Sequence, residues 1–336
     1  MKFVGIDLHK QTISLCVVNQ ARTVLARKTF GCAGTRAIHQ FFAELGPFQA
    51  VVEATASYEW LWQLVEPLAQ RLVLAHPQKL RVIAESTRKS DKLDAQVLAE
   101  FLALDMIPES YRPTPRQRAH RRLVRERMYL VDTQKSVRCR LRAVLADYNA
   151  DDPRLFTLEG MARLKKIPLS AEDRFVVDQL LDLWHFLIQQ IHDVQQQLHV
   201  FAKKAPTAEA EARGVLKTIP RVGPVTIDVV LSEIGDIRRF RSAKQVCAFA
   251  GLVPGHRESA GKRKDLGLIK EGSRRLRWAL IETAWRLVAH THRWKTAYLR
   301  LKEKRGCKKA ITAIARRLLC VMTAMLKTGQ GYRMAA

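Results

Sequence analysis

Short apolar runs that alternate with helical patterns fill the first third of the chain and constrain how it can fold. Strand-forming residues predict strands at 2–9, 12–19, 22–30, 49–54 and 71–75. Apolar residues at helical spacing predict helices at 35–45, 57–70 and 91–104. Two-residue breaks separate the first three strands, and breaks this short favour antiparallel hairpins. Because the later strands alternate with helices, this part is predicted to be an α/β domain with a mixed sheet.

Four carboxylates stand at particular places in this pattern. Asp7 lies near the end of the first strand, Glu53 at the end of the fourth, and Asp91 and Asp94 on the closing helix. A buried strand normally excludes a charge unless the charge is paired or binds metal. Asp91 and Asp94 share one helix face and would repel each other unless a cation lay between them. The order of elements is that of the ribonuclease H-like fold, so we predict a metal site, with an exposed strand end at Asp7 and a helix cap at Asp91 as the alternatives.

The charge of the chain points to a polyanionic partner. The 58 lysines and arginines outnumber the 32 acidic residues, which gives a net charge of +26 and a pI of about 10.3. Such a balance favours nucleic acid first and an anionic membrane surface second. No apolar run approaches a membrane span, and nothing but Met1 precedes the first strand, so we expect no membrane insertion and no signal peptide. The six cysteines form no CxxC pair, which argues against zinc and disulfides and fits the reducing cytosol of a bacterium.

A long basic helix is predicted after a proline-marked linker. Residues 116–148 have helical spacing, and residues 112–142 contain 11 lysines and arginines against two acidic residues. This excess of one sign favours phosphate contacts over a merely solvated face. The candidate nucleic-acid-binding residues here are Arg116, Arg121, Arg122, Arg125, Arg138 and Arg142.

A second long helix is predicted to begin after Ser170, with residues 149–169 as a loop. Its apolar residues step by three and four, which is typical of a coiled-coil seam: Val177, Leu180, Trp184, Leu187, Ile191, Val194, Leu198 and Phe201. The seam needs a facing helix. Either the basic helix of the same chain or another subunit could supply it.

The region after residue 203 begins with an expected polar linker at 203–213. Residues 219–224 then resemble a helix-hairpin-helix turn, in which Arg221 and Gly223 could meet a phosphate at a helix N-terminus. The alternative is an ordinary tight turn between two helices. Residues 281–320 are predicted to be helical.

A second basic segment surrounds Ser259. Residues 257–277 hold eight lysines and arginines against three acidic residues, and we expect a flexible loop that leads into a helix. A serine ringed by cations could attack a phosphodiester, although a lone loop serine is usually nothing more. The candidate nucleic-acid-binding residues here are Lys262, Arg263, Lys264, Lys270, Arg274, Arg275 and Arg277.

Four sequence blocks together resemble one family, the insertion-sequence transposases that join an N-terminal RuvC-like domain with a DEDD quartet to a C-terminal serine-bearing transposase domain. These are the bridge-RNA-guided recombinases. The resemblance covers nearly the whole chain. The blocks are Gly5-Ile6-Asp7 with Lys10, Glu53-Ala54-Thr55-Ala56-Ser57-Tyr58, Lys89-Ser90-Asp91-Lys92-Leu93-Asp94-Ala95, and Gly251-Leu252-Val253-Pro254 through Ser259 to Lys270-Glu271-Gly272. The chain departs from the family at Ala56, where glycine is common, and at Ala260, which separates the serine from Gly261.

The resemblance implies a fold and an activity. It implies a RuvC-like domain at 1–107, a linker and antiparallel coiled-coil helices at 108–205, and a mainly helical transposase domain at 206–336. The quartet Asp7, Glu53, Asp91 and Asp94 would hold Mg²⁺, or Mn²⁺ in its place, and Ser259 would form a transient covalent link to DNA. Ser273 and Ser242 are lesser candidates for that serine. A structured guide RNA would pair with donor and target DNA, and two subunits of a homo-oligomer, a dimer or tetramer, would complete one active site.

The sequence leaves three alternative interpretations of the function. A sugar-kinase-like enzyme also opens with a strand bearing Gly-x-Asp, but Leu8-His9-Lys10-Gln11 follows here in place of a Gly/Thr phosphate loop. A Holliday-junction-type endonuclease would use the quartet with water as the nucleophile. A non-enzymatic nucleic-acid-packaging protein would account for the charge but not for four clustered carboxylates.

Overall fold

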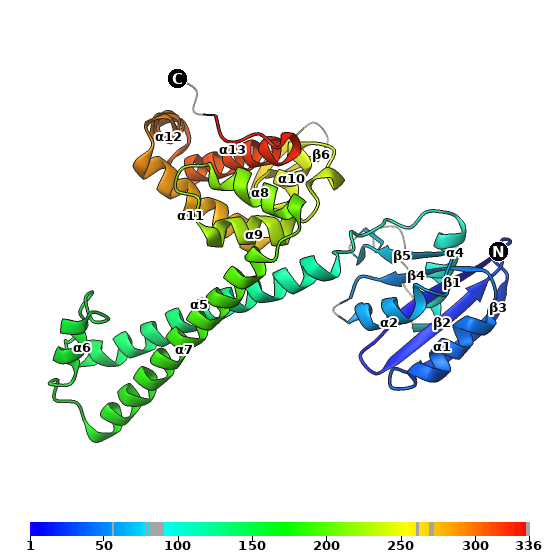
Figure 1. Ribbon diagram of the computed structural model, residues 1–336, viewed down its shortest axis with the longest axis horizontal. Coiled ribbons are helices and arrows are strands. Elements are labelled where there is room, and N and C mark those ends of the chain that lie inside the picture. Colours follow the sequence, from blue (N-terminus) through cyan, green and yellow to red (C-terminus); the bar gives the residue numbers. More distant parts are fainter. Residues whose placement is uncertain (56, 78, 81–90, 260–261, 269–271, 334–336) are drawn as a thin grey trace. The chain divides into compact units, whose positions relative to one another are not determined.

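The computed structural model describes residues 1–55, 57–77, 79–80, 91–259, 262–268 and 272–333, with the side chains of 91–93, 256–259 and 262–266 left out. The chain separates into two compact units, Met1–Arg112 and Pro113–Ala336 (Figure 1). The boundary falls in the predicted proline-marked linker. Each unit is described by itself.

The first unit contains a five-stranded mixed sheet, as predicted. Its strands are β1 (Lys2–Leu8), β2 (Thr12–Val18), β3 (Val24–Gly31), β4 (Phe48–Glu53) and β5 (Arg71–Ala75), in the order β3-β2-β1-β4-β5. The hairpin strands β1, β2 and β3 pair antiparallel, whereas β4 pairs parallel to both β1 and β5. The parallel pairs place the carboxyl ends of β1 and β4 at the same edge of the sheet.

Helices cover both faces of this sheet. Helices α1 (Thr35–Glu44) and α2 (Tyr58–Val65) pack on one face, where Ile38 and Leu61 join a core with Val4 and Ile6. Helix α4 (Asp91–Ala103) packs on the other face, and its Leu98 joins a core with Phe3. Helix α2 ends five residues earlier than predicted, because Pro67 restricts the residue before it and cannot donate to a helical hydrogen bond.

Gly5 allows α4 to cross β1 at very close range. A Cβ at residue 5 would lie 1.9 Å from the Ala95 carbonyl oxygen and 2.6 Å from the Ala99 nitrogen. Both are backbone atoms, so neither can move aside without shifting the helix. Gly5→Ala is therefore expected to destabilise the protein by about 3 kcal/mol. Thermal unfolding would measure this, with Gly31→Ala as the control because the nearest atom to its Cβ lies 4.0 Å away. Equal melting temperatures for the two variants would contradict the prediction.

Two long antiparallel helices begin the second unit, α5 (Pro115–Asp147) and α7 (Ala171–Lys203) (Figure 1). The hydroxyl of Ser170 accepts from the Asp173 backbone N–H and caps α7, which confirms that this helix begins after Ser170. The predicted seam packs against α5 of the same chain, where Val177 and Leu187 are buried with Leu141. Of the two partners left open by the sequence, the structure therefore shows the chain's own basic helix.

The predicted loop at 149–169 was wrong in part, because it contains helix α6 (Leu158–Leu164). The Thr157 hydroxyl caps this helix by accepting from the Gly160 N–H, and Leu164 is buried in the core between α5 and α7. The seven residues of α6 make only about two turns, which is too short to show a helical period in the sequence.

The rest of the second unit is mainly helical. Its elements are α8 (Thr207–Lys217), α9 (Pro224–Ile234), the 3₁₀ turn η1 (Ile237–Arg239), α10 (Ala243–Phe249), β6 (Pro254–Ser259), β7 (Lys262–Leu268), α11 (Arg274–His290), α12 (His292–Arg305) and α13 (Cys307–Thr328). Val124 of α5 and Leu198 of α7 pack with Val229 of α9 and Ala279 of α11, so one core cluster joins the long helices to the C-terminal ones. No helix among the described residues is long and apolar enough to cross a membrane.

Two further predictions were wrong in this region. The expected polar linker at 203–213 becomes α8 from Thr207 onward, which buries Leu216. The expected flexible basic loop is an antiparallel hairpin, β6–β7, whose register pairs Ser259 with Lys262. Paired strands are joined by hydrogen bonds between backbone groups. The two strands therefore pair although their sequences lack the alternating apolar side chains by which strands are recognised.

Candidate functional site

Asp7 and Glu53 lie at adjoining strand ends. Ile6 of β1 is opposite Val52 of β4 in the parallel register, so Asp7 and Glu53 follow immediately on neighbouring strands. Side chains alternate between the faces of a sheet. Because Ile6 and Val52 join the core on the α1/α2 face, Asp7 and Glu53 belong to the face that α4 covers. Asp7 is 8% exposed, and its Oδ2 lies 3.1 Å from Nε2 of His9.

Helix α4 brings the remaining two carboxylates toward this face. Asp94 directly precedes Ala95, whose carbonyl lies against Gly5, two residues before Asp7 on β1. The Asp94 side chain is exposed. Asp91 is the first residue of α4, and its side chain lies outside the described ones. The close contact at Gly5 therefore fixes the position of the N-terminal turn of α4 relative to the sheet.

The donor chemistry of these residues fits a hard divalent cation, which prefers carboxylate oxygens. Asp7 and Glu53 belong to the face that α4 covers, and Asp94 lies on α4 itself. Among the side chains that the structure describes, no three potential metal ligands gather closely enough to hold an ion. Any such site would need Asp91 or a small movement of the described carboxylates.

Ser259 is the last residue of β6, and its backbone pairs with Lys262 at the start of β7. The predicted basic residues Lys262, Arg263 and Lys264 follow on that strand. Their side chains and that of Ser259 lie outside the described ones, and so does Lys270 entirely. The hairpin therefore places the serine next to a basic strand, in the same short element.

The two lesser serine candidates occupy helix starts. The Ser273 hydroxyl accepts from the Leu276 N–H at 3.2 Å, capping α11, and donates to Oε2 of the buried Glu233 at 3.1 Å. Ser242 is the residue before α10. The Ser273 hydroxyl therefore has a structural role at the start of α11.

A buried polar network joins α5, α8 and α9, and the sequence reasoning missed it. Asp228 accepts hydrogen bonds from Arg213 at 2.7 Å and lies 2.9 Å from Nε2 of His120. Glu209 forms ion pairs with both Arg213 and Arg116, at 3.0 and 2.6 Å. The sequence contains a sign of this network, because two charged residues, Asp228 and Glu233, interrupt the otherwise apolar helix α9.

Several predicted phosphate-binding arginines contact this network or its neighbours. Arg116 pairs with Glu209 and Arg125 pairs with Glu233, while Arg121 donates to the backbone carbonyls of Ser232 and Glu233.

Other predicted arginines make contacts outside this network. In the C-terminal half of α5, Arg138 lies over the Phe156 ring at 4.2 Å and Arg142 forms a bidentate pair with Asp151. Arg277 donates to the Ala250 carbonyl. The structure gives these side chains hydrogen-bonding and packing roles within the chain.

The other predicted basic residues are more open. Arg122, Arg221, Arg274 and Arg275 are exposed. Arg221 has φ 62° in the turn between α8 and α9, and Gly223 precedes α9 with φ −92°, so the turn lies between two helices as predicted.

Removal of Asp228 is expected to destabilise the second unit strongly. The Asp228→Ala change would leave His120 and Arg213 without their shared carboxylate in a site where all three side chains are at most 14% exposed. Breaking a buried ion pair in this way costs about 3 kcal/mol or more. Denaturant unfolding would measure the loss. Asp151→Ala is the matched control, since it removes an exposed pair worth at most about 1 kcal/mol.

Acid should selectively weaken the Glu209 contacts. Burial alone would raise the pKa of Glu209, but hydrogen bonds from Arg116 and Arg213 outweigh it and hold the pKa below its ordinary value of 4.5. A carboxyl group whose pKa is lower in the folded protein than in the unfolded chain stabilises the fold. This stabilisation is complete above the pKa of the unfolded chain, and it is lost as the pH falls through the pKa of the folded protein. The melting-temperature difference between wild type and Glu209→Gln should thus be constant above pH 4.5 and shrink below it. Glu211→Gln, on the same helix, controls for the loss of one carboxylate, and a difference that grew in acid would contradict the assignment.

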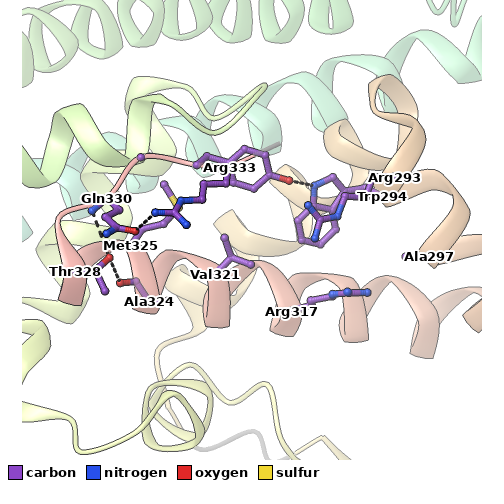
Figure 2. A pocket seen from close by; sticks show the side chains of 12 residues that line it. Arg293, Trp294, Ala297, Arg317, Val321, Ala324, Met325, Thr328, Gln330 and Arg333 are labelled. Atoms are coloured by element: carbon purple, nitrogen blue, oxygen red, sulfur yellow. Dashed lines mark hydrogen bonds between the residues drawn. The ribbon is translucent and has the colours of Figure 1, made fainter. Parts of the chain in front are cut away.

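A small basic pocket lies between α12, α13 and the C-terminal segment (Figure 2). It encloses about 310 Å³, and Arg293, Arg317 and Arg333 line it. The Trp294 indole of α12 donates to the Tyr332 hydroxyl, which ties the C-terminal segment to α12, and Arg333 donates to Gln330 within that segment. None of the sequence-predicted site residues lines this pocket.

Comparison with known proteins identifies both parts of the chain. Residues 4–150 match a DEDD family model of IS110 type described as "Transposase", and residues 213–299 match the "Transposase IS116/IS110/IS902 family". The chain is 26% identical to the transposase of insertion sequence element IS1328 from Yersinia enterocolitica, over 84% of this chain and 82% of that one. It is 26% identical to the transposase of IS1111A from Coxiella burnetii, over 100% and 92% of the two chains, and 24% identical to the pilin gene-inverting protein of Moraxella lacunata, over 98% and 97%. The chain therefore belongs to the IS110 family of DEDD insertion-sequence transposases.

Proposed function

We propose that this transposase cuts and rejoins DNA strands with two catalytic elements, a carboxylate quartet on the sheet of the first unit and Ser259 on the β6–β7 hairpin of the second. The observation that supports this most is the convergence of β1, β4 and α4 at Gly5. It directs Asp7, Glu53 and the start of α4, with Asp91 and Asp94, to one face of the sheet. In this proposal the first unit has a RuvC-like, ribonuclease H-type fold.

Asp7, Glu53, Asp91 and Asp94 would hold Mg²⁺, with Mn²⁺ as a substitute. When bound, such an ion polarises phosphate oxygens and neutralises the charge that develops during strand cleavage. The protein's own part is to bring four negative groups together and to keep them oriented. His9 holds Asp7 from one side through the 3.1 Å contact. The burial of Asp7 under α4 limits the access of water to one side of the site.

Ser259 would act as the nucleophile toward a DNA phosphodiester. Its Oγ forms a bond to phosphorus, the bond from phosphorus to one sugar oxygen breaks, and that sugar oxygen leaves with a proton while the serine proton passes to water. The basic strand β7 would stabilise the charge on the phosphate. Because the serine ester conserves the energy of the broken phosphodiester, the freed end of another strand can reverse the step and restore a DNA backbone.

Two partners complete the proposal. A structured RNA encoded by the element would select donor and target DNA by base pairing, and a homo-oligomer, a dimer or tetramer, would join the quartet of one subunit to the serine of another. The net charge of +26 supports binding of both nucleic acids. Apolar side chains that stay exposed on α7, among them Phe175 and Phe186, support contact between subunits. In this proposal the protein acts in the bacterial cytoplasm, at the nucleoid.

The test is a recombination assay on the full chain purified from its host. We expect the preparation to carry one defined RNA and to exchange strands between two DNA duplexes that match it, only when a divalent cation is present. Ribonuclease treatment followed by return of the same RNA should abolish and restore exchange. Full exchange after ribonuclease treatment would overturn RNA guidance, and cleavage without rejoining would favour the junction endonuclease.

A further inference from the structure

A groove between α5 and α11 carries two exposed aromatic side chains. It has a volume of about 470 Å³, and we call it the α5/α11 groove. Its lining includes Arg127, Tyr129 and Asp132 from α5, and Arg274, Arg275 and Trp278 from α11. All of these residues belong to the second unit, so the groove is complete within it.

The aromatic side chains face solvent to an unusual degree. Tyr129 is 64% exposed and Trp278 is 41% exposed, although aromatic side chains normally bury most of their surface. Neither belongs to a hydrophobic cluster of the described chain. Two open ring faces in one groove are a feature of surfaces that bind planar, apolar ligand parts.

The charges around these rings favour an anion. Three arginines line the groove against a single aspartate. Arg274 and Arg275 are exposed, and within the described part of the chain neither forms an ion pair. Burial lowers the pKa of the Arg127 guanidinium, which marks it as a partly desolvated cation that an arriving anion would stabilise.

We propose that the α5/α11 groove binds an unpaired segment of DNA, with a base stacked on Trp278 or Tyr129 and the neighbouring phosphates on Arg274 and Arg275. Aromatic faces interleaved with cations are the basis of sequence-tolerant binding to single strands. The choice of DNA rests on the proposed function, because strand exchange exposes unpaired DNA. No residue of the predicted quartet or of the helix-hairpin-helix-like turn lines the groove, and Ser259 does not line it either. Arg274 and Arg275 are the predicted basic residues that it includes.

The test compares two single strands of equal charge, an oligothymidine and an abasic strand of the same length. Fluorescence anisotropy with the full chain would measure the affinity for each. We expect wild type to prefer the oligothymidine by about tenfold, because only that strand can stack. Trp278→Ala and Tyr129→Ala should reduce this preference severalfold each, and Trp278→Phe should keep most of it. Trp285→Ala is the matched control, because Trp285 is a 39% exposed tryptophan of the same helix α11 that does not line the groove.

The phosphate contacts have a separate signature. Arg274→Gln with Arg275→Gln should weaken binding to both strands alike. The slope of log affinity against log salt should become shallower by about 1.4, because each phosphate contact on a single strand contributes about 0.7. If wild type binds the two strands equally, or if Trp278→Ala keeps the full preference, the proposal is overturned. A base-dependent preference seen only with an oligouridine RNA would overturn the assignment to DNA. Because binding needs no strand exchange, a protein that stacks DNA but does not recombine it would refute the proposed function and leave this inference standing.

Discussion

Asp7→Asn, Glu53→Gln, Asp91→Asn and Asp94→Asn are each expected to lower strand exchange by at least about a hundredfold, because a metal site that has lost one carboxylate loses several kcal/mol of charge stabilisation. The fold should survive each change. Like charges gathered on one face repel when no cation lies between them, so the metal-free variants should melt at the same temperature as wild type or slightly higher.

A second readout separates metal binding from activity. Added Mn²⁺ should raise the melting temperature of wild type, because a ligand that binds only the folded state stabilises it, and should raise that of each variant much less. The control is Asp105→Asn, which removes an 80% exposed carboxylate of the same unit at a position with φ 52°, a conformation that asparagine tolerates. Full exchange activity in two of the four variants would refute the quartet.

The sheet and the carboxylate positions were predictable because each depends on local order. Short, nearly continuous apolar runs in β1 and β2 reveal strands, and a carboxylate near the end of such a run marks a strand end. The two-residue breaks also predicted correctly which strands pair antiparallel. Helix α4 can lie close to β1 because Gly5 has no Cβ. The backbone atoms that Gly5 contacts belong to Ala95 and Ala99, which are about ninety residues later in the sequence. A single sequence does not show which glycine a helix will cross.

The roles of the arginines were not predictable from their number. A guanidinium binds a phosphate and a carboxylate with the same donors. Arg125 pairs with Glu233 because α9 packs against α5, which is a contact between residues 108 positions apart. Only Asp228 and Glu233 inside an apolar helix hinted that part of the positive charge of α5 is neutralised within the chain.

Short elements were missed for a different reason. Helices α6 and α8 bury few side chains each, so their apolar period is too brief to separate from a loop. The β6–β7 hairpin is rich in charged residues, and composition therefore favoured a flexible segment. Its backbone pairing matters for the proposed chemistry, because a serine on a paired strand is held more firmly than one on a loop.

Ser259→Ala is expected to abolish recombination while leaving nucleic-acid binding intact. A neutral hydroxyl adds little to an electrostatic affinity that depends on lysines and arginines. Without the Oγ no serine ester can form, and attack by water would release the phosphodiester energy that rejoining needs. A DNA substrate with a nick that lets the cleaved fragment escape would trap the ester. Denaturing gels should then show a protein–DNA adduct for wild type and none for Ser259→Ala.

Ser273→Ala provides the matched control for that experiment. It removes the cap of α11 and the hydrogen bond to Glu233, so it should lower stability by about 1 kcal/mol and still form the adduct. Mass spectrometry of the trapped peptide distinguishes the serines, and an adduct on Ser273 or Ser242 would move the nucleophile. Normal cleavage by Ser259→Ala, with no adduct in wild type, would instead mean that the quartet and water suffice. The protein would then be a metal-dependent endonuclease that leaves rejoining to other enzymes, since hydrolysis keeps no activated end.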